Sequence, residues 1–500
     1  MKLTTFLAVA VAGALLALPA AAAELKIGLE DDADVLDPAQ SQTFVGRIVY
    51  TALCDKLVDL SPDLKIVPQL ATEWAWSDDG KQLTMKLRQG VKFHDGTPFN
   101  ADAVVYDVTR SMSLPESKRK SELKSLEKVE AAGEYEVKFT LKNPDVTLLA
   151  ALSDRAGMMI SPTAAKEMGA NFGTKPVCSG PFKFVERVQQ DRIVLEKFQD
   201  YWNKDSIFID KVTYMPIPDT TVRLANLRAG DLDMIERLAA SDAAAVKSDP
   251  NLTYESVVGL GWLGIYFNVG ENATNPLGKD KRLRQAFSLA IDREAANQIV
   301  YEGTSVAGNQ PFSPESPWYD KDIPVPARDL EKAKALVKEA GFDRVPVEMI
   351  VTNNPVIMQM MQVVQSMVAE AGFDVSLKAT EFTTLLDEMT AGNYQVARSD
   401  WSGRADPDGN IHQFLTCKAA LNDAKYCNPE VDKLLNEARQ SPDSAVRKQK
   451  YDAAAAILQD ELPMTFIGHQ SWIWALNKKV TGFVPYPDGM IRLAGVKKAD

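Results

Sequence analysis

The sequence predicts an α/β protein of two or three lobes. Its 500 residues exceed what a single hydrophobic core usually organises. In the second half of the chain, helical and strand-like segments alternate, which is typical of a parallel or mixed sheet covered by helices. The composition, with 45% hydrophobic and 25% charged residues, is that of an ordinary globular protein.

Residues 1–23 have the features of a signal peptide. Lys2 supplies a positive charge, an apolar run extends from Phe6 to Leu18, and Ala21-Ala22-Ala23 offers a cleavage site. The apolar run is too short to span a bilayer comfortably, and no cysteine stands at the cleavage point for a lipid anchor. We therefore expect the mature protein to begin at Glu24 and to be a soluble, periplasmic monomer.

Strand and helix signals alternate early in the mature chain. Residues 25–29 form a short alternating strand, and residues 41–57 place several apolar side chains on one helical face. The run 83–88 alternates apolar and polar residues, as half-buried strands do. Asn100 is a good N-cap for a helix over residues 101–112.

Apolar spacing and cap residues also predict the later elements. Residues 282–300 have the apolar spacing of an amphipathic helix. Asp329 is the expected cap of a helix over residues 330–340, and Gly341 is expected to end it. The other predicted elements are strands at 257–267, 347–351, 373–379 and 464–476 and helices at 358–371, 431–439 and 446–461.

The segment 400–409 stands out because it follows the strand-like run 394–397 and contains turn-forming residues. Trp401 and Arg404 lie three residues apart on this turn. Such a pair suits a ligand with an apolar body and an acidic group, because arginine offers a planar fork to a carboxylate. The alternative is a surface loop in which Arg404 pairs with a nearby acid, Asp400 or Asp406.

The chain has four cysteines, which in an oxidising compartment favours disulfides. Cys417 and Cys427 are the first expected pair, because the loop between them is short. Cys54 and Cys178 are then left, either paired or as free thiols with a redox role. Zinc is disfavoured because there is no C-x-x-C motif.

Charge and motif content exclude several functions. The formal net charge of −12 argues against a nucleic-acid partner. No G-x-S-x-G or H-E-x-x-H motif is present, and only three histidines are available as general bases. We expect no enzyme, no resident metal and no cofactor; an exported hydrolase is the alternative.

The segment from Leu83 to Val104, with L-R-x-G-V-K-F-H-D-G-x-P-F-N-A inside it, resembles the signature of the family 5 extracellular solute-binding proteins. These are the peptide- and nickel-binding receptors of ABC importers. Cys178 replaces a glycine in one family motif, and Ala103 departs slightly from another. Further matching segments are Cys178–Phe182, Tyr201-Trp202, Ile217–Thr221, Leu227–Asp233 and Lys281–Arg293.

The resemblance implies a two-lobed periplasmic binding protein fold (type II, cluster C-like), with a hinge of crossing strands and an extra subdomain on the first lobe. It implies that lobe I comprises residues 24–60, 180–268 and 475–500, that the subdomain comprises 61–179 and that lobe II comprises 269–474. It further implies a peptide or other small ligand buried between the lobes and delivered to permease subunits in the inner membrane.

The resemblance also directs attention to two arginines. Peptide receptors of the family carry W-x-x-D after a central strand, and that aspartate pairs with the peptide's α-amino group. Arg404 stands at the aspartate position, which disfavours a free ammonium there, unless Asp400, Asp406 or Asp408 turns inward. Arg155 lies six residues before Ser161-Pro162, where nickel receptors have an arginine that binds the chelator's carboxylates.

We therefore expect Arg404 and Arg155 to favour a carboxylate-bearing ligand, with Trp401 and Phe44 as apolar walls. An acidic or modified peptide, an opine-like conjugate and a chelated metal each fit; a nickel or haem-type ligand is the alternative. The competing interpretation of Arg155 is an ion pair with Asp154.

Overall fold

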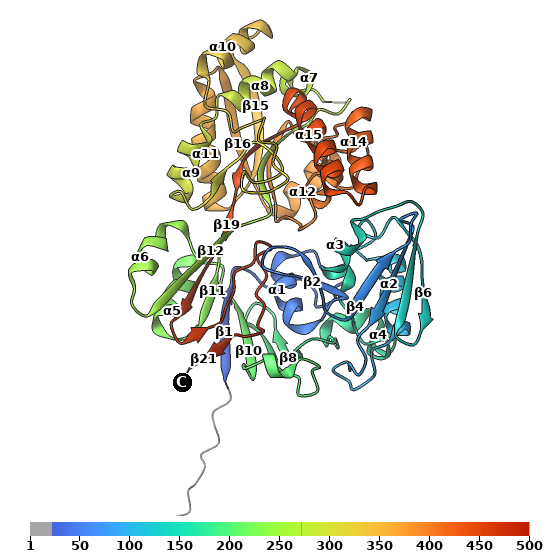
Figure 1. The fold of residues 1–500 in the computed structure, drawn as a ribbon. Coiled ribbons are helices and arrows are strands. Elements are labelled where there is room, and N and C mark those ends of the chain that lie inside the picture. The colour runs from blue at the N-terminus through green and yellow to red at the C-terminus, as the bar shows by residue number, and fades with distance from the viewer. Residues whose placement is uncertain (1–22, 272, 500) are drawn as a thin grey trace, which may run out of the picture.

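The computed structural model describes residues 23–271 and 273–499, so the predicted signal peptide lies almost entirely outside the described residues. Three main sheets carry the fold. One forms the centre of the lower half in Figure 1, a second lies beside it, and a third forms the upper lobe. Helices pack around these sheets, and the prediction of an α/β protein is confirmed.

The first sheet has seven strands in the order β12-β19-β11-β1-β10-β9-β8. Its central strand, β1 (Glu24–Leu29), runs parallel to both neighbours, and the alternate residues Leu25, Ile27 and Leu29 are buried. The other strands are β8 (Phe182–Val188), β9 (Arg192–Lys197), β10 (Lys211–Pro216), β11 (Met234–Glu236), β12 (Leu252–Val258) and β19 (Ser471–Asn477), with the helices α5 (Thr220–Ala229) and α6 (Ala243–Ser248).

Helix α1 (Phe44–Leu53) packs against this sheet and is shorter than the helix predicted at 41–57. The hydroxyl of Thr43 accepts a hydrogen bond from the backbone N–H of Gly46, which starts the helix. Cys54 adopts an extended conformation and ends it. The apolar face predicted from the sequence is the buried one.

The second sheet is antiparallel, in the order β4-β5-β7-β6. Helix α2 (Ala101–Ser113) covers it, and the side chain of Asn100 accepts from the N–H of Ala103 as predicted. The strands are β4 (Ala71–Trp76), β5 (Gln82–Leu87), β6 (Leu126–Gly133) and β7 (Glu136–Leu141); nearby lie β2 (Val58–Leu60), β3 (Ile66–Pro68), α3 (Leu148–Leu152) and α4 (Pro162–Met168).

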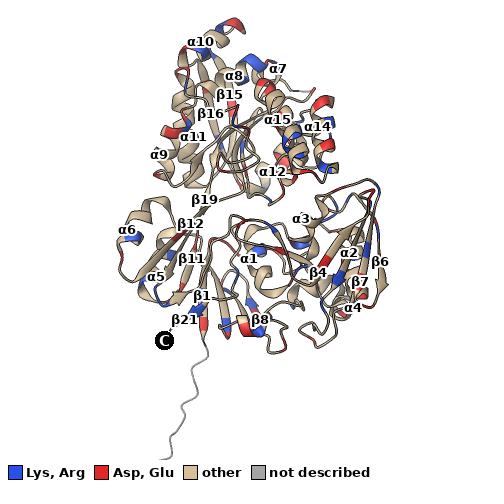
Figure 2. Cartoon of the chain, in the orientation of Figure 1, with Lys and Arg blue, Asp and Glu red and all other residues tan. Residues whose placement is uncertain are grey.

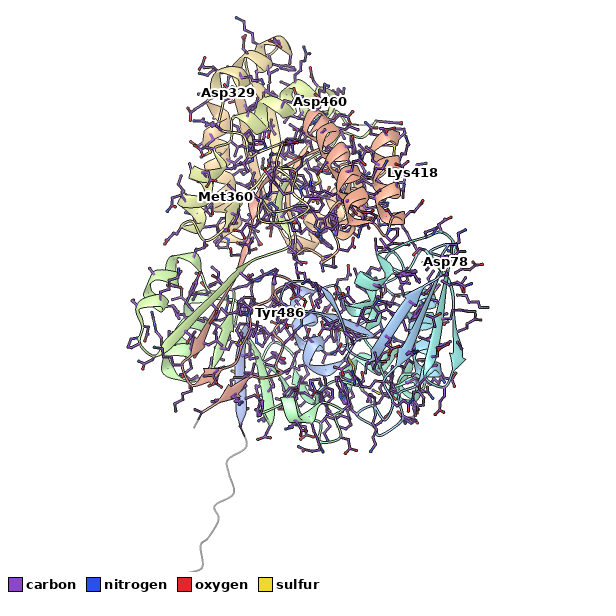
Figure 3. The ribbon with its side chains drawn as sticks, in the orientation of Figure 1. Asp78, Asp329, Met360, Lys418, Asp460 and Tyr486 are labelled. Carbon is purple, nitrogen blue, oxygen red and sulfur yellow. A yellow bond between two sulfur atoms is a disulfide. The ribbon has the colours of Figure 1, made fainter. Side chains whose placement is uncertain are left out.

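The third sheet has six strands in the order β14-β18-β13-β17-β15-β16. In Figure 1, α9, α10 and α11 lie on one side of it and α14 and α15 on the other, each over its own apolar cluster. Figure 3 shows the side chains that fill this lobe, among them the buried Met360 of α11. The strands are β13 (Trp262–Phe267), β14 (Val306–Ala307), β15 (Val345–Thr352), β16 (Phe373–Thr380), β17 (Val396–Trp401) and β18 (Met464–His469).

The predicted helices of this lobe are present, with one difference, and three further helices were not predicted, at Pro276–Lys279, Phe382–Ala391 and Asp408–Leu415. The predicted helix 282–300 is divided into α8 and α9, because the side chain of Asp292 caps a new helix by accepting from the N–H of Ala295. The helices are α7 (Pro276–Lys279), α8 (Lys281–Leu289), α9 (Arg293–Tyr301), α10 (Leu330–Glu339), α11 (Pro355–Ala369), α12 (Phe382–Ala391), α13 (Asp408–Leu415), α14 (Pro429–Gln440) and α15 (Ser444–Glu461).

The chain passes between the first and third sheets at two places, between β12 and β13 and between β18 and β19. Each was expected as one continuous strand. At the first crossing a Cβ atom on Gly261 would lie 1.7 Å from the carbonyl oxygen of Trp401, so only glycine fits there. Pairing places β13 in the third sheet, whereas the boundary at 268 assigned it to lobe I.

All four cysteines form disulfides. Cys54 bonds to Cys178, which ties the end of α1 to the segment before β8, and Cys417 bonds to Cys427. Both pairings considered from the sequence are thus present, and the free-thiol and zinc alternatives are wrong. Among residues 23–271 and 273–499, no helix has the length and apolar character needed to cross a membrane.

Candidate functional site

The two lobes touch where the loop after β17 meets the segment after α3. Nε of Arg404, in the upper lobe, lies 3.4 Å from Oδ2 of Asp154. Close by, the N–H of Val146 donates to the carbonyl oxygen of Arg439 at the end of α14, at 3.1 Å. Figure 1 shows α3 and α14 facing each other across this junction. These contacts place the residues around Asp154 at the junction of the two lobes.

Asp154 lies at the centre of a group of guanidinium groups. Its Oδ1 accepts from Nε of Arg47 at 3.1 Å and from the backbone N–H of Arg155 at 2.8 Å. Its Oδ2 is 3.1 Å from Nη2 of Arg47. Burial alone would raise the pKa of Asp154, but Arg47, Arg404, Arg155 and Arg119 hold this pKa well below its usual range. The carboxylate is therefore ionised.

We call Arg47, Arg119, Arg155 and Arg404 the arginine cluster. All four share Asp154, Arg119 also pairs with Glu122, and Asp488, which is paired with Arg492, lies near Arg47. Nη1 of Arg47, Nε of Arg119 and Nε of Arg155 are buried and have no hydrogen-bond partner within the described part of the chain. In Figure 2, blue segments mark α1 and the neighbourhood of α3 on the side that faces the upper lobe.

The environment of the cluster penalises this surplus positive charge. Burial, together with the neighbouring arginines, lowers the pKa of Arg155 to about 9 and that of Arg404 to about 10. Part of the charge is met by backbone carbonyls: Nη1 of Arg155 donates to the oxygen of Ser41 at 2.9 Å, and Nη2 of Arg119 donates to the same oxygen at 3.1 Å. An added anion would stabilise all four guanidinium groups.

The predicted pair Trp401 and Arg404 is held in a defined orientation. The guanidinium carbon of Arg404 lies 4.4 Å from the centroid of the Trp401 ring. Nε1 of Trp401 donates to Oδ1 of Asn410 at 3.0 Å, and the backbone N–H of Arg404 donates to the same atom at 2.7 Å. The Trp401 ring also packs edge-to-face on Phe414 at 5.0 Å. The stacked pair therefore presents Arg404 to Asp154.

Phe44 and Asp400 belong to a neighbouring part of the same junction. Phe44 stacks on Trp472, with ring centroids 4.4 Å apart, and the guanidinium of Arg237 lies over both rings at 5.1 and 5.3 Å. Asp400 accepts a hydrogen bond from Arg398 on its own strand. Asp400 also lies close to Arg237 of the lower half. Burial lowers the pKa of Arg237, but the carboxylates of Glu30, Glu236 and Asp400 raise it above its ordinary value.

Asp406, one of the candidate ligand-binding residues, is paired within the upper lobe. Its two carboxylate oxygens accept from Arg447 at 2.9 and 2.5 Å. Asp408 pairs in the same way with Arg439. These pairs connect the start of α13 to α14 and α15. Arg404 pairs with neither Asp400 nor Asp406.

Sequence reasoning missed Arg47 and Arg119. Arg47 was detectable as a charged residue inside the otherwise apolar helix α1, where it is 5% exposed. Arg119 lies in the basic run Lys118–Lys120, which looks like solvent-exposed surface in the sequence. Arg155 was found by resemblance as a ligand-binding residue, and the ion pair with Asp154 that was its competing interpretation is present at 4.0 Å.

Metal ligands do not gather in the described residues: no group of three or more His, Cys, Asp or Glu side chains there could hold a metal ion. Burial lowers the pKa of His94 and His469 to about 4 and that of His412 to about 3, so all three imidazoles are neutral at pH 7. The arginine cluster is thus the main concentration of unmatched charge at the junction.

Comparison of the sequence and the fold with known proteins identifies the family. The sequence model for bacterial extracellular solute-binding proteins, family 5, middle region, matches residues 65–422. The chain is 28% identical over 496 residues to the glutathione-binding protein GsiB of Pectobacterium atrosepticum, which covers 96% of this chain and 95% of that protein.

Solved structures show the same fold. The dipeptide-binding protein from Pseudoalteromonas sp. SM9913 in complex with Met-Leu matches with a TM-score of 0.85 and 25% identity, over 95% of this chain and 100% of that one. The binding protein AgaA in complex with agropinic acid, from A. tumefacien R10, matches with a TM-score of 0.83 and 27% identity, over 95% and 99%. The predicted fold and resemblance are confirmed: this protein belongs to the bacterial extracellular solute-binding proteins, family 5.

Proposed function

We propose that this protein captures a small acidic solute between its two lobes. Membership of the family makes it a substrate-binding component of an ABC importer, a class of transport proteins that are not enzymes. What the proposal adds is the chemistry of the solute, which carries at least one carboxylate or comparable anionic group, and the place where that group binds, which is the arginine cluster.

One observation carries the proposal: four guanidinium groups from both sides of the lobe junction surround the single carboxylate of Asp154, and three of their buried nitrogens lack a hydrogen-bond partner within the described residues. Unpaired buried donors are costly, and charge-assisted bonds to an anion remove that cost. The ammonium group of an ordinary peptide would instead be repelled by Arg404.

The ligands named for two relatives agree with this chemistry. One relative is called glutathione-binding, and another was solved with agropinic acid. Both compounds are acidic. A dipeptide complex is also among the similar structures, so an acidic peptide stays within the proposed class.

The proposal extends to the processing, the location and the domain boundaries of the protein. We propose that the leader is removed after Ala23, which keeps β1 whole, and that the mature monomer works in the periplasm. We propose that the boundaries between lobe I, with its subdomain, and lobe II lie at residues 259–261 and at residue 470, where the chain passes from one sheet to the other. The permease receives the closed form, in which contacts such as Arg404 with Asp154 are made.

The proposal is tested by native mass spectrometry of the protein purified from an exporting host without refolding. A bound mass that corresponds to one acidic compound supports the proposal and identifies the solute. A ladder of neutral or basic peptide masses would overturn it. The same preparation of Arg404→Glu serves as the comparison, because reversal of that charge should abolish retention of an acidic solute.

A further inference from the structure

A second charged pair lies on β17, outside the arginine cluster. Arg398 and Asp400 are two residues apart on one strand, so their side chains share a face of the sheet. Nη1 of Arg398 donates to Oδ1 of Asp400. The guanidinium is buried, with 0% of its side chain exposed. Its Nε and Nη2 have no hydrogen-bond partner in the described chain.

Asp400 is the accessible member of this pair. Its side chain is 33% exposed, and its Oδ2 has no hydrogen-bond partner within residues 23–271 and 273–499. Tyr301, at the end of α9, lies beside the pair. Burial raises the pKa of the Tyr301 hydroxyl to about 12; the charge of Arg398 and a side-chain hydrogen bond with it oppose this effect, and Asp400 reinforces it.

The charge that faces Asp400 from the lower half is already matched. Arg237 is the arginine on that side, and it pairs with Glu30 and, at 3.5 Å, with Glu236. Two carboxylates therefore neutralise one guanidinium. A cation placed at Asp400 meets an environment that is close to neutral or acidic, quite unlike the arginine cluster.

Beyond its contacts with Asp400 and Tyr301, the Arg398 guanidinium keeps N–H donors for a ligand, and Asp400 keeps one carboxylate oxygen. This pair has a definite complement. The donors suit a carboxylate, which guanidinium binds through parallel hydrogen bonds. The free oxygen of Asp400 suits an ammonium group. Because the two side chains lie next to each other, the complementary groups must also be adjacent, as they are on the α-carbon of an amino acid. The amino terminus of an ordinary peptide has the ammonium without that carboxylate.

We propose that Arg398 and Asp400 bind an α-amino acid head group at one end of the solute, while the arginine cluster binds a carboxylate at its other end. The inference rests on the proposed function and narrows its substrate class. The solutes it selects are γ-linked peptides and side-chain-linked amino acid conjugates. Linear α-peptides, whose terminal ammonium has no carboxylate on the same carbon, are disfavoured.

The test uses three probes that differ only at the head group. S-methylglutathione carries the head group and a distant glycine carboxylate, and its blocked sulfur cannot exchange with the protein's disulfides. Its N-acetyl derivative lacks the ammonium. The analogue with 4-aminobutanoyl in place of γ-glutamyl lacks only the α-carboxylate. Isothermal titration of the full mature protein should show binding of S-methylglutathione and at least tenfold weaker binding of the other two.

Variants assign the contacts. Asp400→Asn should weaken S-methylglutathione at least tenfold and should abolish the difference between it and the N-acetyl derivative. Arg398→Lys, which keeps the charge but loses the fork, should reduce the penalty for removing the α-carboxylate. The control is Asp374→Asn. Asp374 lies on β16 and forms an exposed ion pair with Arg344, so this variant should bind all three probes with unchanged affinity.

The outcomes separate the two proposals. Equal affinity of the wild-type protein for all three probes would overturn the head-group inference and leave the acidic-solute proposal standing. Failure of every probe to bind at millimolar concentration would overturn the head-group inference, and an empty or peptide-loaded protein in the mass measurement would then remove the proposed function as well. Unchanged discrimination in Asp400→Asn would show that the pair is only structural.

Discussion

Nε of Arg404 lies 3.4 Å from Oδ2 of Asp154, and this ion pair joins the two lobes. Both side chains are mostly buried, with 19% and 11% exposed. Asp154 thus supplies an internal carboxylate at the place where a solute's acidic group is proposed to bind. The solute and Asp154 share the same guanidinium groups, so the balance between them sets the affinity.

Removal of the Arg404 side chain should weaken solute binding more than folding. In Arg404→Ala, Asp154 keeps its two contacts with Arg47, so the melting temperature of the free protein should change little. Loss of a charge-assisted bond to the acidic group should lower affinity by about ten- to a hundredfold, or ~1.5–3 kcal/mol. Titration with the solute identified by mass spectrometry measures this.

Arg344→Ala provides the matched control for that experiment, because Arg344 forms an exposed pair with Asp374 on the outer strands of the third sheet. This variant should bind as the wild-type protein does. Retention of full affinity by Arg404→Ala would remove Arg404 from the proposed site.

Neutralisation of Asp154 should have opposite effects on the free and bound protein. In Asp154→Asn, the four arginines lose the carboxylate that they share, and a buried charged group that loses its partner typically destabilises the protein by about 3–5 kcal/mol. The free protein should therefore melt at a lower temperature. A bound anion should restore more stability to this variant than to the wild-type protein, because it replaces the lost charge.

Melting curves in sodium sulfate and in sodium chloride at equal ionic strength check this prediction. We expect sulfate to raise the melting temperature of Asp154→Asn more than that of the wild-type protein, with Asp374→Asn as the control. If the variant were as stable as the wild-type protein in both salts, Asp154 would not be what holds the arginine cluster together.

Acid should destabilise the junction of α1 and the subdomain through His94. Nδ1 of His94 accepts from the N–H of Cys178 at 3.2 Å, so Nε2 carries the proton and donates to the oxygen of Gly180 at 3.0 Å. Burial lowers the pKa of His94 to about 4. The unfolded chain binds this proton near pH 6.5, so stability is lost as pH falls from about 6.5 to 4.

This loss amounts to about 2 kcal/mol at pH 5 from His94 alone. His94→Gln offers one acceptor and one donor without a titration, so its unfolding free energy should fall less between pH 7 and pH 5. Urea unfolding at the two pH values measures the difference. An identical fall in both proteins would mean that His94 titrates alike in the folded and unfolded states.

Local signals predicted the elements of the fold well because their physical causes are local. Asp329 caps α10 by accepting from the N–H of Lys332, and Gly341 follows it at φ +89°, which are contacts within a few residues. The predicted helix 282–300 is in fact two helices. The cap residue between them, Asp292, was visible in the sequence, but the apolar spacing continues across it and favoured a single helix.

The candidate site was only partly predictable, because it is made by contacts across the fold. Arg404 and Arg155 were found from their motif positions, but Asp154 and Arg404 are 250 positions apart, and no local pattern says that their lobes meet. Arg47 is a buried charge in an apolar helix, and its role becomes clear only from its contact with Asp154, which lies far away in the sequence. Nor does a turn sequence show that Arg447 lies beside Asp406.

The two disulfides should contribute unequally to stability. Cys54–Cys178 spans 124 positions and Cys417–Cys427 spans 10. The chain-entropy relation gives about 5 kcal/mol for the longer loop and about 3 kcal/mol for the shorter one. The pair variant Cys54→Ser with Cys178→Ser should therefore melt at a lower temperature than Cys417→Ser with Cys427→Ser, in scans without reductant. The reverse order would mean that unfolding begins in the upper lobe, where the short loop lies, and not at the junction of α1 with the subdomain.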